Sequence, residues 1–250
     1  MRIDYPTQGQ LPQLRKLWQE AFGDTDAFLD LFFSTGFSPD RCLAVQVEGQ
    51  VAAALYWMDC RLEGKPVAYL YAVATAQSFR HQGICRALME RTRALLSQLG
   101  YAGILLVPGT DALRQMYAAM GYEAATTITE CSFTAGTESL SLSPITGEEY
   151  LRLRRHYLPG GSVLQESCPS FLAGCYDLYA GENCLLAAVK TDSGLICPEY
   201  LGDSDKIPAV LRALGTSAGR IRMPGADKPF AMWLPLSDTP APKYFAFAFD

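Results

Sequence analysis

The sequence predicts a mixed α/β fold in two parts, a larger domain over residues 1–135 and a second, smaller α/β domain over residues 136–250. Two observations predict it. Helical and strand patterns follow one another in the order ααββ-βαβαβ across the first half, which is typical of a mixed sheet with helices on its faces. In addition, 49% of the 250 residues are hydrophobic and 19% are charged, a balance that supports a buried core and argues against disorder.

The first 75 residues predict two helices and three strands. Leucines and aromatic residues share one face of a helix over residues 10–22, and Asp24-Thr25-Asp26 caps a second helix. β-type runs over 42–47 and 51–60 are joined by a Glu-Gly-Gln turn. Residues 67–75 are almost uninterrupted apolar residues, which indicates a strand covered on both faces.

The rest of the first half continues this alternation. Residues 83–99 have helical spacing and end at Gly100, residues 101–107 read as a buried strand, and residues 112–120 read as a helix that Gly121 stops. A β-type run over 122–133 closes the predicted domain, and residues 135–138 read as a linker.

The second half repeats this order in weaker form. It predicts helices over 146–157, 169–180 and 208–214, a hairpin over 185–201, and strands near 219–223, 230–236 and 244–249. One interpretation is an internal duplication, and the other is the chance resemblance of α/β segments to one another.

Composition and charge exclude several classes of protein. The net charge of −5 and the pI near 5.1 argue against nucleic acid or an anionic membrane as the main partner. The first residues lack the apolar run of a signal peptide, and no stretch approaches the roughly 20 apolar residues of a membrane span. The eight cysteines form no C-x-x-C pair and there are only two histidines, so the spacing of a metal site is missing. We therefore expect a soluble cytoplasmic protein with reduced thiols and no metal.

The most informative stretch follows the strand over residues 67–75. It reads Arg80-His81-Gln82-Gly83-Ile84-Cys85-Arg86 and leads into the next helix. The start of a helix offers unpaired N–H groups and the positive end of the helix dipole, so it suits a pyrophosphate. Gly83 lets the backbone approach a ligand, and Cys85 is small. Because both G-x-G-x-x-G and G-x-x-x-x-G-K-[ST] are absent, the stretch alone would also fit an ordinary strand-to-helix connection.

This stretch closely resembles motif A of the GNAT superfamily of N-acetyltransferases, which reads R/Q-x-x-G-x-G/A after a Val-rich strand. Arg80, Gly83 and Cys85 fill the three signature positions, although Cys85 departs from the usual Gly or Ala. A second GNAT marker, an aromatic residue before a Gly-aromatic pair, appears over residues 117–122 as Tyr-Ala-Ala-Met-Gly-Tyr. The resemblance covers about residues 1–135, and the Val-Ala-Thr lead-in is similar to the branch with multi-domain aminoglycoside acetyltransferases.

The resemblance implies an N-acetyltransferase that moves acetyl from acetyl-CoA to a primary amine of a small molecule or peptide, by direct attack in a ternary complex. It implies that backbone groups of Val73 and Thr75 pair with the pantetheine arm, and that the N–H of Val73 supports the oxyanion. Tyr117 would protonate the departing thiolate, or is alternatively a core tyrosine. The pyrophosphate would be cradled by the backbone from His81 to Arg86, that is His81, Gln82, Gly83, Ile84, Cys85 and Arg86, with the Arg80 and Arg86 side chains in support.

The acceptor side is less defined. The strand before the turn carries no acid, so Asp59 and Glu63 are the nearest candidates in sequence for a general base, and a water chain is the alternative. In this fold the first helix pair lines the acceptor cleft, so Asp26, Asp30 and Phe33 are expected to contact the substrate, with the carboxylates attracting a cationic amine. They fit helix caps and a solvated helix face equally well.

Three further expectations concern the rest of the chain. In the aminoglycoside-modifying relatives the terminal carboxylate reaches the active site, which suggests a similar role for Asp250. The second half has an acidic stretch over residues 201–206 where the phosphate turn would lie, so we expect one coenzyme per chain. The alternation of aromatic and small residues in the tail predicts a strand with one packed face. Such an apolar strand could also lie at the interface of a homodimer. The alternative functions are a non-catalytic acyl-CoA-binding or regulatory module and an acyltransferase that uses a longer acyl-CoA.

Overall fold

The computed structural model describes residues 1–249, so Asp250 lies outside the described residues. They form two compact units, and each unit combines two stretches of the chain. The first comprises Met1–Glu123 and Met232–Ala241, and the second comprises Ala124–Ala231 and the residues from Pro242 onward. None of the helices within residues 1–249 has the length and apolar composition that a membrane crossing requires.

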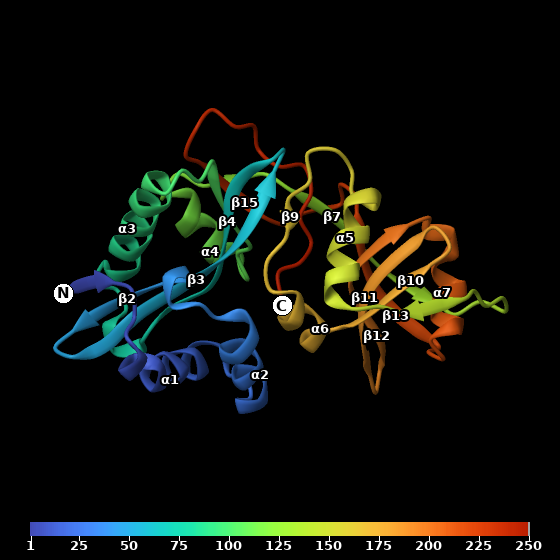
Figure 1. Ribbon diagram of the computed structural model, residues 1–250, viewed down its shortest axis with the longest axis horizontal. Coiled ribbons are helices and arrows are strands. Elements are labelled where there is room, and N and C mark those ends of the chain that lie inside the picture. The colour runs from blue at the N-terminus through green and yellow to red at the C-terminus, as the bar shows by residue number, and fades with distance from the viewer. Residues whose placement is uncertain (250) are drawn as a thin grey trace. The chain divides into compact units, whose positions relative to one another are not determined.

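A mixed sheet forms the centre of the first unit (Figure 1). Its strand order is β1-β2-β3-β4-β5-β15-β6. The bounds are β1 (Arg2–Asp4), β2 (Cys42–Val47), β3 (Gln50–Leu62), β4 (Lys65–Thr75), β5 (Gly103–Leu106), β6 (Glu123–Ala124) and β15 (Met232–Pro235). β4 and β5 run parallel, because a helix crosses between them, whereas β1 to β4 are joined in antiparallel pairs.

Helices cover both faces of this sheet. The bounds are α1 (Leu11–Phe22), α2 (Asp26–Leu31), α3 (Ile84–Gln98) and α4 (Asp111–Ala118), with short helical turns at Gln8–Gln10, Phe32–Gly36, Pro39–Arg41 and Gln77–Phe79. Figure 1 shows α1 and α2 on one face and α3 on the other. The alternation of side chains along β3 explains this arrangement. Leu55 and Trp57 join the core under α3, whereas Tyr56 between them lies 5.1 Å from the ring of Trp18 on α1.

A bulge interrupts β4 near its C-terminal end. Tyr71 lies opposite Tyr56 and Ala74 opposite Ala54, so two residues of β4 face a single residue of β3. One of the two, Ala72, has a φ of +49°, a conformation that residues with a side chain rarely adopt. Pairing with β5 covers only residues 67–69, so the bulge lies beyond the point where the two parallel strands separate.

The second unit is built on a second mixed sheet, in the order β14-β7-β13-β12-β11-β10-β8. The strands are β7 (Thr127–Thr134), β8 (Leu142–Pro144), β10 (Asp177–Gly181), β11 (Cys184–Thr191), β12 (Gly194–Gly202), β13 (Ala218–Pro224) and β14 (Lys228–Pro229). The short strand β9 (Leu164–Gln165) is not part of this sheet. The helices are α5 (Gly147–Tyr157), α6 (Pro169–Cys175) and α7 (Ile207–Ala213), with a helical turn at Ser204–Lys206. α6 is shorter than the predicted helix over 169–180, because residues 177–181 form β10.

The two units share one topology. In the first unit β1, α1, α2, β2, β3, β4, α3 and β5 follow one another, and in the second unit β8, α5, α6, β10, β11, β12, α7 and β13 follow in the same roles. β12 also carries a register shift against β11 and pairs in parallel with β13 over only three residues, as β4 does with β5. This correspondence supports an internal duplication.

The last strand of each half lies in the other half's sheet. β7 follows α4 in sequence but pairs with β13, and β15 follows the second unit's strands but pairs with β5. The structure therefore differs from a single division at residue 135, and the run over 230–236 belongs to the first sheet. Periodicity predicted these strands, but it carries no information on which sheet a strand joins.

The second unit contains a buried ion pair between α5 and β12, where the first unit has an aromatic contact between the corresponding helix and strand. Arg154 on α5 is 1% exposed and donates to both carboxylate oxygens of Glu199 on β12, at 2.6 and 2.8 Å. The hydroxyl of Tyr150 donates to the same carboxylate at 3.0 Å. In the first unit the corresponding helix and strand bring together Trp18 and Tyr71, whose ring centroids are 5.5 Å apart.

The C-terminal segment differs from the predicted strand over 244–249. It forms an isolated bridge between Tyr244 and Ser162 instead of a strand of either sheet. It is nevertheless buried, because the guanidinium of Arg222 donates to the carbonyl of Ala246 at 3.2 Å and Phe247 stacks on Tyr176 at 6.0 Å.

Candidate functional site

The turn after β4 is held by a series of local hydrogen bonds. The amide of Ala76 donates to the carbonyl of Ala52 on β3 at 2.9 Å, and the amide of Phe79 donates to the carbonyl of Ala76 at 2.8 Å. The Nε of Arg80 donates back to the carbonyl of Thr75 at 3.1 Å, which anchors the arginine across the turn. These bonds place the residues after Arg80 at the start of α3.

The start of α3 has the conformation and the free donors of an anion site. His81 and Gly83 both have positive φ, +61° and +75°. A Cβ at Gly83 would meet no atom within 4 Å, so the space in front of this residue is open. No side chain caps the helix, and the amides of Ile84, Cys85 and Arg86 belong to its first turn, where amides lack intrahelical partners. His81, Gln82, Gly83 and Arg86 are exposed, so the region fits a phosphate group.

Val73 and Thr75 lie on the bulged end of β4. Val73 is half-buried and packs against the core under α3, whereas its neighbour Ala72 faces α1. Simple alternation would place Val73 on the same face as Tyr71, which contacts Trp18 of α1. The extra residue of the bulge keeps Ala72 on that face and shifts Val73 to the other one. Thr75 is half-buried, and its carbonyl accepts the bond from Arg80. Within the described residues the ladder between β4 and β5 ends at Tyr69, before Val73 and Thr75.

Tyr117 lies in the last turn of α4 and is 6% exposed. Its ring meets that of Tyr122 edge to face, with centroids 5.8 Å apart. Burial raises the pKa of the Tyr117 phenol, and the nearby Cys85 thiol raises it further. The phenol carries its proton at neutral pH, as an unshifted tyrosine also does. Burial also raises the pKa of the Cys85 thiol, while Thr75 and Arg86 act in the opposite direction.

The acidic residues predicted for the acceptor side pair with one arginine. Arg15 on α1 lies 2.7 Å from Asp30 and 3.9 Å from Asp26, and its guanidinium lies 5.6 Å from the ring centre of Phe33. The side chains of Asp26 and Asp30 are 80% and 73% exposed. The carboxylates therefore lie on a solvated, ion-paired helix face, and their contact with a substrate stays a prediction.

Asp59 and Glu63 lie away from the bulge. Asp59 pairs in register with Ala68, five residues before Val73, which corresponds to ~16 Å along the strand. Its carboxylate accepts hydrogen bonds from Arg41 at 2.9 Å and from the hydroxyl of Tyr101. Glu63 is an exposed turn residue with a φ of +49°. Neither is placed to take a proton from an amine at Val73.

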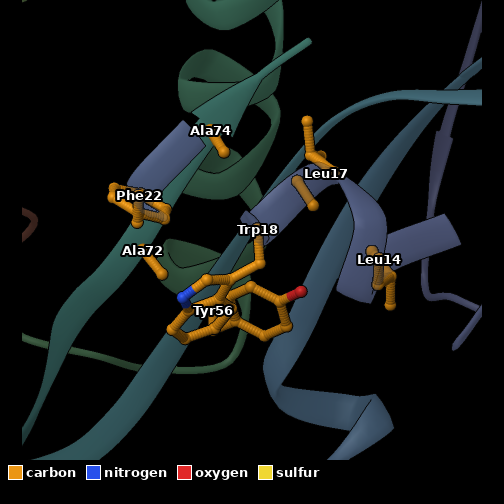
Figure 2. Close-up of a pocket in the computed structure, with 8 residues that line it drawn as sticks. Leu14, Leu17, Trp18, Phe22, Tyr56, Ala72 and Ala74 are labelled. Atoms are coloured by element: carbon orange, nitrogen blue, oxygen red, sulfur yellow. The ribbon is translucent and has the colours of Figure 1, made fainter. Parts of the chain in front are cut away.

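A small hollow lies between α1 and β4, next to the bulge. Figure 2 shows that Trp18, Tyr56 and Ala72 gather around it. It contains about 140 Å³ of empty space but is too narrow to admit a water molecule. Apolar and aromatic side chains line it, namely Leu14, Leu17, Trp18, Phe22, Ala54, Tyr56, Ala72 and Ala74. It is a packing gap beneath α1, and residues of α1 line it together with Ala72 of the bulge.

Sequence reasoning missed one residue of this region, Glu20. Its carboxylate accepts a hydrogen bond from the amide of Gln77 at 2.5 Å, which links the end of α1 to the first residue of the turn. In the sequence Glu20 is an ordinary exposed residue of an amphipathic helix, and no local pattern relates it to a residue 57 positions away.

Comparison with known proteins identifies the family. The family model described as "Acetyltransferase (GNAT) domain" matches residues 2–125. No curated protein matches the chain in sequence. Among residues 1–249, no group of three or more His, Cys, Asp or Glu side chains is arranged to hold a metal ion.

Solved structures show the same fold at low sequence identity. A GCN5-related N-acetyltransferase from Kribbella flavida is 18% identical with a TM-score of 0.71, and the match covers 93% of this chain and 70% of that one. One from Anabaena variabilis is 17% identical with a TM-score of 0.70, covering 94% and 73%. Eis1 from Mycobacterium abscessus is 13% identical with a TM-score of 0.67, covering 94% and 74%. The chain therefore carries a GNAT acetyltransferase domain over residues 2–125.

Proposed function

We propose that this protein transfers the acetyl group of acetyl-CoA to a primary amine of a small molecule or peptide, by direct attack within a ternary complex. Three structural features that follow one another along the chain carry the proposal. A bulged strand separates from its parallel neighbour, the turn after it has two residues at positive φ, and the next helix begins without a side-chain cap. These features meet within residues 72–86, inside the part of the chain that matches the GNAT family.

In this proposal the first turn of α3 binds the pyrophosphate of the coenzyme. The amides of residues 81–86 are the donors, and the positive end of the helix dipole favours the negative charge. Arg80 and Arg86 add cationic side chains beside the same turn. The backbone of Val73 and Thr75 pairs with the pantetheine arm along the part of β4 beyond its ladder with β5.

The acyl transfer requires support for the oxyanion and a proton for the leaving thiolate. We assign the first role to the amide of Val73, because the bulge at Ala72 redirects the backbone at this point. We assign the second role to the Tyr117 hydroxyl, because Tyr117 lies near Cys85 in the first turn of α3 and a phenol carries its proton at neutral pH. The acceptor must arrive as a neutral amine, since a protonated amine has no free electron pair.

Calorimetric titration with acetyl-CoA tests the proposal. We expect micromolar binding by the wild-type protein and loss of binding in an Arg80→Ala/Gly83→Trp double variant. Tryptophan at position 83 would enter the open space before the helix and would be strained at positive φ. Arg91→Ala, at an exposed arginine on the same helix, serves as the control and should bind normally. A folded wild-type protein that does not bind acetyl-CoA would refute the proposal.

A further inference from the structure

Glu20 occupies a position that the stability of its own helix does not explain. It lies in the last turn of α1, where the helix dipole presents its negative end and an acidic side chain is unfavourable. The last turn contains no basic residue to offset it. Its contact across the fold, a hydrogen bond of 2.5 Å from the amide of Gln77, compensates for this placement.

The bond reaches the turn at its first residue. Gln77 opens the short helical turn Gln77–Phe79, so its amide is one that the turn itself does not satisfy. A carboxylate accepting from such an amide makes a charge-assisted bond, which is stronger than a bond between neutral groups. The carbonyl of Gln77 in turn accepts the amide of Arg80 at 3.3 Å. Gln77 is therefore hydrogen-bonded through its amide to Glu20 and through its carbonyl to the amide of Arg80.

The support behind Glu20 is rigid. Leu14, Leu17 and Trp18 of the same helix are at most 4% exposed. The Trp18 ring lies 5.5 Å from that of Tyr71, the residue of β4 just before the bulge. α1 is thus fixed on β4 on one side of the bulge by packing, and Glu20 fixes the backbone on the other side by a hydrogen bond.

We infer that Glu20 is a positioning residue for coenzyme binding, which presets the phosphate turn from α1 before the ligand arrives. The inference rests on the proposed function, since it requires the coenzyme to bind at this turn. Without the carboxylate, Gln77 would bond to water and the turn would sample more conformations, so that binding would have to order it. Because Glu20 contacts neither Val73 nor Tyr117, its loss should weaken binding and leave the rate at saturation unchanged.

The test compares Glu20→Ala and Glu20→Gln with the wild-type protein. The alanine variant should raise the Kd for acetyl-CoA about 3- to 10-fold, the effect of one hydrogen bond to a backbone amide. The glutamine variant keeps an acceptor oxygen and should bind within about 2-fold of the wild type. Lys16→Ala, at another exposed position of α1, controls for surface substitution on the helix. Hydrogen exchange at the Gln77 amide should quicken in the alanine variant alone.

The outcomes separate this inference from the function on which it rests. Faster exchange at Gln77 with an unchanged Kd in Glu20→Ala would overturn the positioning role while leaving coenzyme binding intact. A loss of binding that the glutamine variant does not restore would also overturn it. A folded wild-type protein that fails to bind acetyl-CoA would instead refute the proposed function, and the inference with it.

Discussion

Gly103 is the position where a single methyl group should disturb the first sheet most. It is the first residue of β5 and pairs with Val67 of β4 on one side and with Pro235 of β15 on the other. The indole of Trp233, from β15, lies across it. A Cβ at Gly103 would stand 2.0 Å from Cη2 and 2.2 Å from Cζ2 of that ring, whereas carbon atoms in contact are normally about 3.5–4.0 Å apart.

Gly103→Ala should therefore cost about 3 kcal/mol of unfolding free energy, at the upper end of the usual range for overpacking. Trp233 is 3% exposed, so its ring has no solvent to move into and must leave its position in the core. Urea unfolding followed by far-ultraviolet circular dichroism measures the loss as a lower midpoint.

A double-mutant cycle with Trp233→Leu tests the cause. Leucine removes the clashing ring atoms at the cost of a cavity, about 2–4 kcal/mol when introduced alone. The double variant should be more stable than the sum of the two single losses by about 1.5 kcal/mol or more, because the added methyl group then has room. Additive losses, within about 0.5 kcal/mol, would refute the reasoning, since they would mean that the two side chains do not compete for the same space.

Three further predictions follow from buried groups. Glu199→Ala should lower the unfolding free energy by about 3–5 kcal/mol because it leaves Arg154 buried without its partner, and a loss below about 1 kcal/mol in urea unfolding would contradict a desolvated pair. Tyr117→Phe should lower kcat about 10²-fold while calorimetry finds the Kd for acetyl-CoA unchanged; an undiminished kcat would exclude the phenol as the acid. Buried tyrosines should make the protein unstable in alkali, because their raised pKa lets the unfolded chain ionise first. The unfolding free energy should be constant below about pH 10 and should fall above it by roughly 1.4 kcal/mol per pH unit for each such residue. A urea midpoint that is unchanged at about pH 10.5 would contradict the burial of these tyrosines, which are Tyr56, Tyr117, Tyr122, Tyr150 and Tyr244.

Local sequence patterns predicted the elements of the first half well. The helices expected over 10–22 and 83–99 correspond to α1 and α3, because their apolar spacing and their terminal glycines are properties of the segment itself. The uninterrupted apolar strand expected over 67–75 corresponds to β4, which helices cover on both faces. The bulge within β4 was not predicted, since it depends on the register with β3.

Properties that depend on distant partners could not be read from the sequence. The pairing of Asp26 and Asp30 with Arg15 could not be read from the sequence, because Arg15 lies outside their own helix. Glu20 looked solvated, and its bond to Gln77 depends on how α1 packs on the sheet. The tail after residue 243 alternates like a strand, but it forms an isolated bridge at Tyr244 and not a strand, because the segments it meets are distant in sequence. A local sequence pattern predicts the secondary structure of a segment, whereas these roles depend on contacts with residues that are distant in sequence.

The exchange of β7 and β15 has a consequence for how the chain acquires its fold during synthesis. After residue 123 emerges, the ribosome must add about 110 residues before β15 can pair with β5, which takes roughly 6–20 s at usual elongation rates. Over that interval the first half exposes an open sheet edge at β5, and the indole that covers Gly103 does not yet exist. The candidate coenzyme site is thus encoded within the first 125 residues, but the sheet that carries it is completed only after residue 235 has been made. A chain whose halves exchange strands in this way cannot lose either half without opening the sheet of the other.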